Sequence, residues 1–337
     1  MDSITHLALG ACMGGVFAEK KLKKKALLWG AVAQSIPDID FLASFWMDTA
    51  SNLLAHRGFT HSLLFVGIIS PLFAALAERW HRPHDISFGK WLSFFLAVIG
   101  THVFFDAFNN YGVGWWEPFS HTRISFDIIY VADPFFSIWP AIAVGIYLFF
   151  PWLWKFKLNV LAAGLILSTS YLGYGCINKL VIESRARQIL QDKNIMYTRL
   201  LTTPAPLQNW LWYIVAADST GYHIGFQSLF ESGKNAHFEY FPKNDSLLQS
   251  YDDHTELNKL KRFSKGYYTA EKWGDTLVFN DLRFGQMIGW QDPKQNFVFH
   301  YFLRHDADNT LVVQRGRFKY WDKKVISNFM NRIFYAD

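Results

Sequence analysis

Long uncharged stretches separated by short polar segments dominate the first half of the chain. Residues 134–154 and 158–178 are each 21 residues long and contain no charged side chain. At a helical rise of about 1.5 Å per residue, either stretch can cross a hydrocarbon core roughly 30 Å thick. Six apolar segments can be drawn, at residues 4–18, 26–36, 62–78, 91–108, 134–154 and 158–178. The pattern predicts an α-helical membrane bundle of about six apolar segments. The last four are expected to span, and the first two to form a buried hairpin or a re-entrant pair.

The pattern changes near residue 180, after which charged residues recur every few positions. Alternating apolar and β-branched runs predict strands at residues 210–216, 222–230, 237–241, 276–280, 297–303 and 310–317. Before them, residues 180–200 have the pattern of a short amphipathic helix, and the two prolines within 202–206 predict a stiff linker. We therefore expect a helical membrane domain (1–178), an amphipathic helix and linker (179–206), and a small β-rich α+β soluble domain (207–337). The soluble domain shows no catalytic motif and is interpreted as a packing or substrate-shaping domain.

Composition narrows the class of protein. Apolar residues make up 51% of the chain and charged residues 18%, below the roughly 25% of an average soluble domain. This composition excludes a wholly soluble protein and an intrinsically disordered one. Only two cysteines occur, both in apolar stretches, which excludes a disulfide scaffold. The net charge is +5, but the basic residues gather at the ends of apolar segments. We interpret them as a topology signal and expect no nucleic-acid partner.

Basic loops alternate with acidic ones along the membrane half. Residues 20–25 contain five lysines, a second basic loop covers residues 79–90, and Lys155 and Lys157 follow the fifth segment. The intervening loops, 37–61 and 109–133, contain five aspartates. By the positive-inside rule, the basic loops lie in the cytoplasm. The acidic loops and residues 180–337 are therefore expected on the periplasmic or extracellular side.

Histidines and aspartates are concentrated at the predicted outer ends of the apolar segments. The candidate metal ligands are His6, Asp38, Asp40, His56, His61, His102, Asp106 and Asp133. Each one alone has an ordinary explanation, such as a polar contact between helices or an N-cap before a proline. The segment boundaries, however, put all of them at the same membrane face. Because ionisable groups at a bilayer are costly, this grouping predicts a functional site.

The spacing of these residues favours metal ligation. His102 and Asp106 are four residues apart and share one helix face. Asp38 and Asp40 follow a proline, where an extended turn lets both carboxylates reach one site. Imidazole and carboxylate donors suit zinc, with manganese as the alternative. Since the candidates outnumber the ligands of one tetrahedral ion, we predict a divalent-metal site that holds two ions.

Arginine and further polar residues flank the candidate ligands. Arg57 is predicted either to anchor a phosphate or carboxylate of the substrate or to pair with an aspartate of the site. Arg57 and Asp40 are the candidates for catalytic roles. His121 and Arg123 are second-tier candidates for the same roles.

These motifs, in this order, resemble a known family. Residues 5–6, 37–40, 56–62, 102–106, 109–112, 116–120 and 133–134 resemble the membrane-bound metal-dependent hydrolases, also described as LexA-binding, inner-membrane-associated hydrolases. The resemblance covers about residues 1–180 and implies a multi-pass protein of the bacterial inner membrane with metal-dependent hydrolase activity.

A more distant similarity is to zinc-dependent phospholipase C, which uses an N-terminal His, an Asp, a His and a His-x-x-x-Asp pair in that order. It implies ligand roles for the matching residues His6, Asp38, His56 or His61, His102 and Asp106. The later His…His-x-x-x-Glu ligands of that enzyme are missing from this sequence, which argues against a three-metal site.

The leading hypothesis is an inner-membrane hydrolase of a phosphoester in a lipid or lipid-linked substrate, acting by two-metal activation of water. An amide or ester of a lipid-linked molecule is an alternative substrate. Two other classes stay open: a transporter or metal-handling membrane protein, and a non-enzymatic regulator that binds a protein partner. Transporters place ionisable residues near the middle of the membrane, whereas these gather at one end. No partner surface is evident in the sequence.

Overall fold

The chain divides into two compact units. The computed structural model describes all residues except 82–85, 232–235, 304–308, 310–317, 319 and 336–337. The first unit contains residues 1–45 and 55–175, and the second contains residues 46–54 and 176–337.

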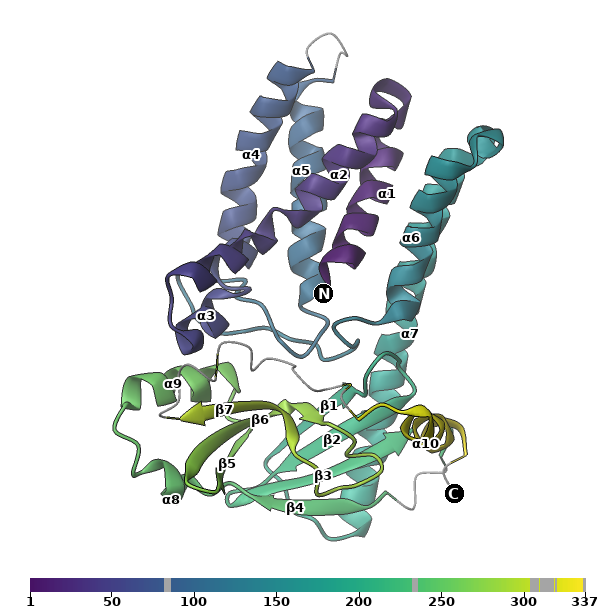
Figure 1. The fold of residues 1–337 in the computed structure, drawn as a ribbon. Helices are drawn as coiled ribbons and strands as arrows, with labels where there is room; N and C mark the ends of the chain where they lie inside the picture. The colour runs from purple at the N-terminus through teal and green to yellow at the C-terminus, as the bar shows by residue number, and fades with distance from the viewer. Residues whose placement is uncertain (82–85, 232–235, 304–308, 310–317, 319, 336–337) are drawn as a thin grey trace. The chain divides into compact units, whose positions relative to one another are not determined.

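The first unit is a bundle of helices (Figure 1). Its long helices are α1 (Ser3–Leu22), α2 (Lys24–Ser35), α4 (Leu63–Trp80), α5 (Phe88–Asp106), α6 (Pro134–Phe149) and the first part of α7 (Lys157–Asp192). Within the described residues, short 3-10 helices connect them: η1 (Pro37–Phe45), η2 (Phe59–His61) and η4 (Pro151–Phe156). Apart from its last residue, α3 (Thr49–Ala55) belongs to the second unit. Buried aromatic side chains of α5, among them Trp91 and Phe95, form the centre of the bundle.

Among the described residues, α4, α5 and α7 are long and apolar enough to cross a membrane. Helix α6 is apolar but has only 16 residues and ends at Phe149. The predicted span at 134–154 is therefore split between α6 and η4, and η4 begins at Pro151, a residue that disfavours continuation of a helix. Helices α1 and α2 form a hairpin, one of the two arrangements expected for the short segments. The helical region with apolar candidate spans is confirmed, whereas the count of six segments with four spans is not.

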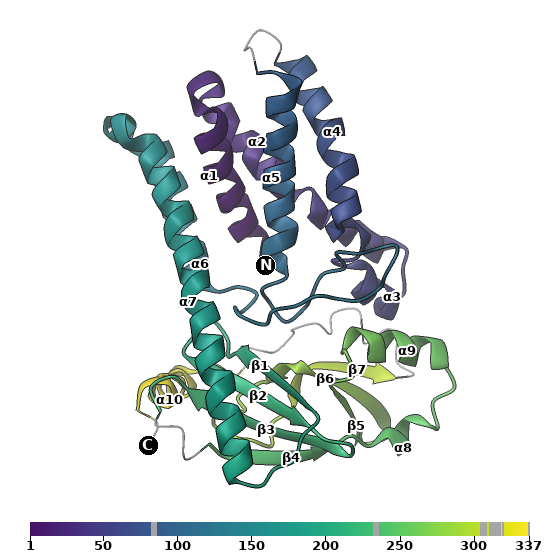
Figure 2. The ribbon, with the colours of Figure 1, turned by 180° about the vertical axis from the view of Figure 1, so that it is seen from behind.

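The basic and the acidic loops of the first unit lie at opposite ends of the bundle. Lys20 at the end of α1, Lys90 near the start of α5 and Leu158 at the start of α7 line one cavity, so these three helix ends are neighbours. Figures 1 and 2 show them at the end of the bundle opposite the N-terminus. The candidate ligands lie at the other end, because they start α1 and end α5.

The second unit contains two antiparallel sheets. The first has the order β1–β2–β3–β4, with β1 (Arg199–Pro204), β2 (Leu211–Ala217), β3 (Gly221–Ser228) and β4 (Phe238–Pro242). The second has the order β5–β6–β7, with β5 (Tyr268–Trp273), β6 (Thr276–Gln286) and β7 (Phe297–Leu303). Its helices, apart from the rest of α7 and α3, are α8 (Asp245–Leu248), α9 (His254–Phe263) and α10 (Lys323–Phe334).

Strands β2, β3, β4, β6 and β7 confirm five of the predicted strands, and the sixth, at 310–317, lies outside the described residues. Strands β1 and β5 were not predicted. The prediction of a linker at 202–206 is wrong, because residues 202–204 belong to β1. Thr202 and Thr203 pair with Ile214 and Tyr213 in β2. Pro204 is tolerated there because it ends an edge strand, where no ladder hydrogen bond is lost within the sheet.

The amphipathic end of α7 covers the first sheet. Ile182 and Ala186, one turn apart, are buried against Trp212 and Ile214 of β2. Helix α10 buries Val325, Phe329 and Ile333 in the main core of the same unit. The four-residue spacing of these side chains is the helical period of an apolar stripe.

The close approach of α1 and α2 depends on glycine. A Cβ atom on Gly30 would lie 1.9 Å from the carbonyl oxygen of Gly10, a distance that no packed structure allows. A Cβ atom on Gly67 of α4 would meet nothing within 4 Å. We expect Gly30→Ala to push the two helices apart and to lower the unfolding temperature of the purified protein by about 5 °C or more. The matched control Gly67→Ala should unfold at or above the wild-type temperature, because alanine favours helix. Equal unfolding temperatures for the two variants would contradict this packing.

Candidate metal centre

Four side chains from three elements meet at one end of the first unit. They are Asp38 of η1, His61 of η2, and His102 and Asp106 at the end of α5. One donor atom from each lies within 4.8 Å of the donor atoms of the other three. His61, His102 and Asp106 are fully buried, and the side chain of Asp38 is 24% exposed.

The distances between these donor atoms fit a single metal ion. The Nε2 atoms of His61 and His102 are 3.1 Å apart. His61 Nε2 lies 3.3 Å from Asp106 Oδ2 and 3.7 Å from Asp38 Oδ1. His102 Nε2 lies 3.5 Å from Asp38 Oδ1 and 3.6 Å from Asp106 Oδ2. A tetrahedral zinc ion with bonds of about 2.0–2.2 Å separates its ligands by about 3.3–3.6 Å. Five of the six donor pairs therefore lie close to the spacing of a tetrahedral ligand set, and all six lie within 4.8 Å.

Both histidines have the hydrogen-bond pattern of metal ligands. His102 Nδ1 contacts the backbone carbonyl oxygen of Gln34, and His61 Nδ1 lies 3.3 Å from Asp40 Oδ2. An acceptor at Nδ1 fixes the proton there and leaves the Nε2 lone pair available. The two Nε2 atoms then lie 3.1 Å apart in the buried interior. With a lone pair on each, a cation between them would be a better partner than the other nitrogen.

The charges of the pocket also call for a cation. Burial would raise the pKa of Asp38, but hydrogen bonds from His102 and His61 hold it well below its usual range. Burial would lower the pKa of His61, but its hydrogen bonds to Asp106, Asp38 and Asp40 raise it to about 10. Asp106 Oδ2 is buried and accepts no well-aligned hydrogen bond from any described residue. Either a proton on His61 or a divalent ion can supply the positive charge, and the donor set fits the ion.

Local structure explains why these residues end their segments here. Ser62 caps α4 by accepting a hydrogen bond from the backbone N–H of Phe65, so His61 is held just before the helix begins. The loop that follows α5 holds the same segment through the backbone N–H of Gly114, which donates to the carbonyl oxygen of Arg57. Arg57 has a φ of +57°, a conformation that residues other than glycine rarely adopt. Such strain is typical of functional sites.

Arg57 lies beside Asp106 rather than in open space. Its Nε is 3.1 Å from Asp106 Oδ2, and its side chain is 3% exposed. Its Nη1 donates to Asn109 Oδ1 at 2.8 Å, and its Nη2 donates to the carbonyl oxygen of Met1 at 3.2 Å. Of the two roles considered from the sequence, this geometry fits the aspartate partner. Bound in this way, Arg57 orients Asp106.

Asp40 and His56 form a pair behind the four-donor group. Asp40 accepts hydrogen bonds from the backbone N–H of Arg57 at 2.7 Å and from Thr60 Oγ1 at 3.2 Å. His56 Nδ1 lies 3.0 Å from the other oxygen of Asp40. Asp40 therefore contacts both His56 and His61, and His56, whose side chain is 35% exposed, lines a cavity.

His6 contacts the opposite oxygen of Asp106. Its Nε2 is 3.1 Å from Asp106 Oδ1, and its ring stacks on His102 with the centroids 3.8 Å apart. Gln34 Nε2 lies 3.4 Å from His6 Nδ1. Asp106 thus faces His6 with one oxygen and the four-donor group with the other.

Three predicted residues have other positions. Asp133 caps α6 through the backbone N–H of Phe135 and accepts a hydrogen bond from Tyr171, so its carboxylate is engaged outside the four-donor group. His121 is largely exposed and contacts Glu117 at 2.7 Å. The guanidinium of Arg123 donates to the carbonyl oxygen of His56 and supports that loop.

Sequence reasoning gave no site role to Gln34 or to Asn109, although Asn109 belongs to the motif 109–112 of the family resemblance. Both are fully buried polar residues that hold site residues in place: Gln34 contacts His6 and His102, and Asn109 accepts from Arg57. Gln34 could have been noticed as a lone polar residue at the end of the apolar segment 26–36. Asn109 could have been noticed three residues after Asp106.

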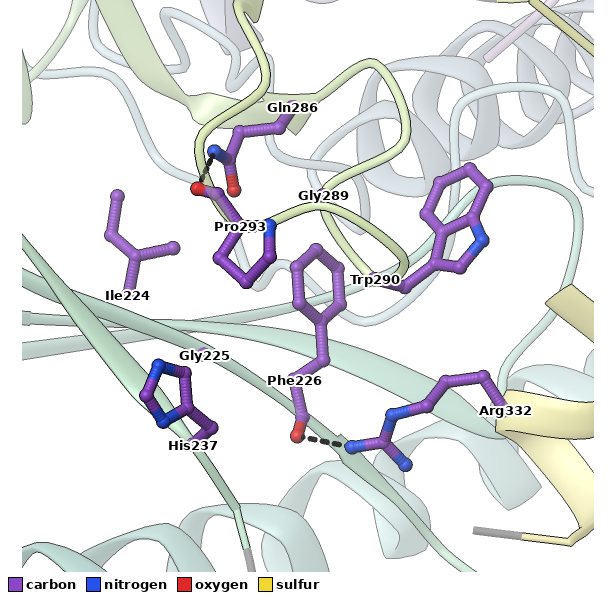
Figure 3. Close-up of a pocket in the computed structure, with 9 residues that line it drawn as sticks. All are labelled: Ile224, Gly225, Phe226, His237, Gln286, Gly289, Trp290, Pro293 and Arg332. Carbon is purple, nitrogen blue, oxygen red and sulfur yellow. Dashed lines mark hydrogen bonds between the residues drawn. The ribbon is translucent and has the colours of Figure 1, made fainter. Parts of the chain in front are cut away.

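A cavity of about 560 Å³ adjoins the site. Its walls include Ser35, Asp38, Ile39, Asp40, Phe41 and His56. The volume is within the range of about 300–1,000 Å³ typical of small-molecule sites. By contrast, the cavity in the second unit between β3 and the loop after β6 has a volume of about 70 Å³, well below that range (Figure 3). Access to the four-donor group is therefore through its Asp38 side.

A helical bundle with apolar candidate spans and a candidate metal-binding group at one end defines a membrane protein with a buried polar site. The family described as YdjM inner membrane protein matches residues 1–181, and the protein belongs to this family. Family membership and the apolar helices together support an inner-membrane location. The hydrolase activity and the LexA binding implied by the sequence resemblance stay predictions.

Two relatives each match part of the chain. The inner membrane protein YbcI of Escherichia coli (strain K12) is 31% identical over 144 residues, which cover 42% of this chain and 75% of YbcI. The uncharacterized protein YfhP of Bacillus subtilis (strain 168) is 30% identical over 154 residues, which cover 44% of this chain and 46% of YfhP. The chain thus spans about half the length of YfhP. No solved structure matches the chain.

The four-donor group makes a direct prediction about metal content. Asp106→Asn and His61→Gln should each lower the metal that co-purifies with the full chain at least about tenfold, because each removes one of four ligands. His121→Gln, an exposed position in the same unit, is the matched control and should keep wild-type metal content. Elemental analysis by mass spectrometry of detergent-purified protein measures this. Full metal content in Asp106→Asn would overturn the assignment.

Proposed function

We propose that this protein is a metal-dependent hydrolase of phosphoesters in a membrane lipid or a lipid-linked substrate. The observation that carries the proposal is the group of Asp38, His61, His102 and Asp106, whose donor atoms have tetrahedral spacing beside a cavity of about 560 Å³. Asp38, the partly exposed member, lines that cavity. A metal site with a purely structural role would need no cavity beside one of its ligands.

The donor set of two imidazoles and two carboxylates suits zinc best, with manganese as the alternative. When bound, the ion would supply Lewis acidity toward a phosphoryl oxygen and an activated water. A second ion, as predicted from the sequence, would need Asp106 Oδ1 and His6 Nε2, and it would have to displace the N-terminal ammonium of Met1, which pairs with Asp106 Oδ1. That second ion stays a prediction, because the four-donor group by itself fits one.

The protein's own residues orient the site and hold protons near it. With Nδ1 held by Asp40 at 3.0 Å, His56 can exchange a proton at Nε2 on the cavity side. Arg57 keeps the carboxylate of Asp106 in place and balances its charge. Asp40 keeps His61 Nε2 directed toward the other donors. We assign positioning roles to Asp40 and Arg57, the two residues that the sequence predicted as catalytic.

The walls of the cavity support a lipid substrate. Ile39 and Phe41, which are 44% and 60% exposed, line it together with Asp38 and His56. An apolar wall next to charged groups fits a molecule with a polar head and an apolar chain. The transporter alternative is less well supported, because the ionisable residues lie where α5 ends and α1 begins.

We also propose the orientation of the protein in the membrane. The lysine-rich end of the bundle and the metal-site end are opposite, as the alternation of basic and acidic loops predicts. The positive-inside rule assigns the lysine-rich end to the cytoplasm. The metal site and the residues that follow α7 would then face the periplasm.

Hydrolysis can be tested with the purified full chain in detergent micelles. We expect release of a phosphorylated head group or of phosphate from at least one phospholipid or lipid phosphate in a panel, dependent on zinc or manganese and abolished by a chelator. Asp106→Asn should lower the rate at least about a hundredfold, because the several kcal/mol that a metal supplies to the transition state would be lost. His121→Gln should retain the rate. Metal-loaded protein that leaves the whole panel intact would contradict the proposal.

Orientation can be tested with a reporter fused after residue 337. Alkaline phosphatase folds to its active form in the oxidising periplasm, so a fusion there should be active, whereas a reporter that fluoresces only in the cytosol should stay dark. A fusion at the α1–α2 turn, within residues 20–25, should give the opposite pattern. The reverse result at both positions would place the site in the cytoplasm and favour a cytosolic protein partner.

A further inference from the structure

A second large cavity lies at the lysine-rich end of the first unit. It has a volume of about 480 Å³, and its walls include Val16, Phe17, Lys20, Lys21, Lys90 and Leu158. The ends of α1, α5 and α7 contribute to it, and α1 lies between α5 and α6 in both views of the bundle (Figures 1 and 2). Because it is at the end opposite the metal site, the proposed hydrolysis does not use it.

The described part of this cavity is positively charged. The ammonium groups of Lys20 and Lys90 are exposed, and neither forms an ion pair with a described residue. The neighbouring acid, Glu19, is buried and paired with Lys157, and it accepts a hydrogen bond from Tyr147. The negative charge of Glu19 is thus balanced within the bundle. The cavity therefore keeps the positive charge of Lys20 and Lys90.

The apolar wall of the cavity continues from the lysines along α1. Val16 and Phe17 are four residues before Lys20 and Lys21, so each pair lies one turn apart on one face of the helix. Val16 is 46% exposed and Phe17 is 38% exposed. Lysine stems lie along apolar surface while their charged ends stay at the polar boundary. The cavity is thus cationic at its outer end and apolar one turn further into the bundle.

We propose that this cavity binds one anionic phospholipid, with the phosphate at Lys20 and Lys90 and the start of an acyl chain along Val16 and Phe17. The order of charged and apolar groups along α1 matches the order of head group and chain in a lipid. Basic pockets between membrane helices on the cytoplasmic side are known to hold anionic head groups. A soluble anion would use the lysines but gain nothing from the apolar wall.

The test is a lipid titration of the detergent-purified full chain, followed by native mass spectrometry. The probes are phosphatidylglycerol, phosphatidylcholine with the same acyl chains, and glycerol phosphate. We expect one phosphatidylglycerol to bind at least about tenfold more tightly than phosphatidylcholine, since each nearby lysine contributes to the attraction. Lys20→Gln combined with Lys90→Gln should remove this preference. The matched control, Lys24→Gln with Lys25→Gln, changes the same charge at exposed positions outside the cavity walls and should change binding less than twofold.

Two further measurements separate the possible outcomes. Val16→Gln keeps the charge. It should weaken the binding of phosphatidylglycerol several-fold without changing the binding of glycerol phosphate. All variants should keep wild-type metal content, so a loss here is distinguishable from failure of the metal site. Equal losses in the two double variants would overturn the proposal in favour of diffuse surface charge. Competition by glycerol phosphate at concentrations equal to the lipid would overturn it in favour of a soluble-anion site.

Discussion

A carboxylate placed at the buried end of a helix must have its charge balanced by its neighbours, and Asp106 imposes this requirement on the first unit. Its two oxygens face in different directions, one toward His6 and the N-terminal ammonium of Met1, and the other toward Arg57, His61 and His102. These partners come from the N-terminus, from α1, from the segment before α4 and from α5 itself. The position of each of these elements is therefore tied to the compensation of one charge.

Buried charges of this kind usually cost stability unless they are paired and hydrogen-bonded, so their retention points to a function. In this site each histidine is held at Nδ1 and left available at Nε2, and Asp40 and Gln34 provide the holding acceptors. That division of roles between inner donors and outer acceptors is what a metal ion needs. Asp40 and Arg57 lie behind the four-donor group and contact its members His61 and Asp106.

The two ends of the first unit carry different ionisable groups. One end collects carboxylates and imidazoles beside an opening, and the other collects lysines beside an apolar wall. Charge asymmetry of this sort orients helices during membrane insertion. The same asymmetry gives the two ends different side-chain chemistry, with carboxylates and imidazoles at one end and ammonium groups at the other.

The sequence by itself determined the apolar lengths, the alternation of basic and acidic loops, and the grouping of histidines and aspartates at one end. It also determined that His102 and Asp106 lie on one helix face, because the helical period places residues four apart side by side without any tertiary contact. Local alternation likewise predicted most strands of the second unit. These features depend on near neighbours in the chain, which a single sequence displays.

Only the tertiary structure decided which of the grouped residues meet. Asp133 and Asp38 look alike in the sequence, yet one caps α6 and the other joins His61 and His102. Arg57 has a positive φ and its side chain lies beside Asp106. No local sequence pattern predicts either feature. Gln34 matters through contacts with residues 28 and 68 positions away. Such contacts are set by how helices pack, and the packing depends on glycines such as Gly30 that carry no chemistry of their own.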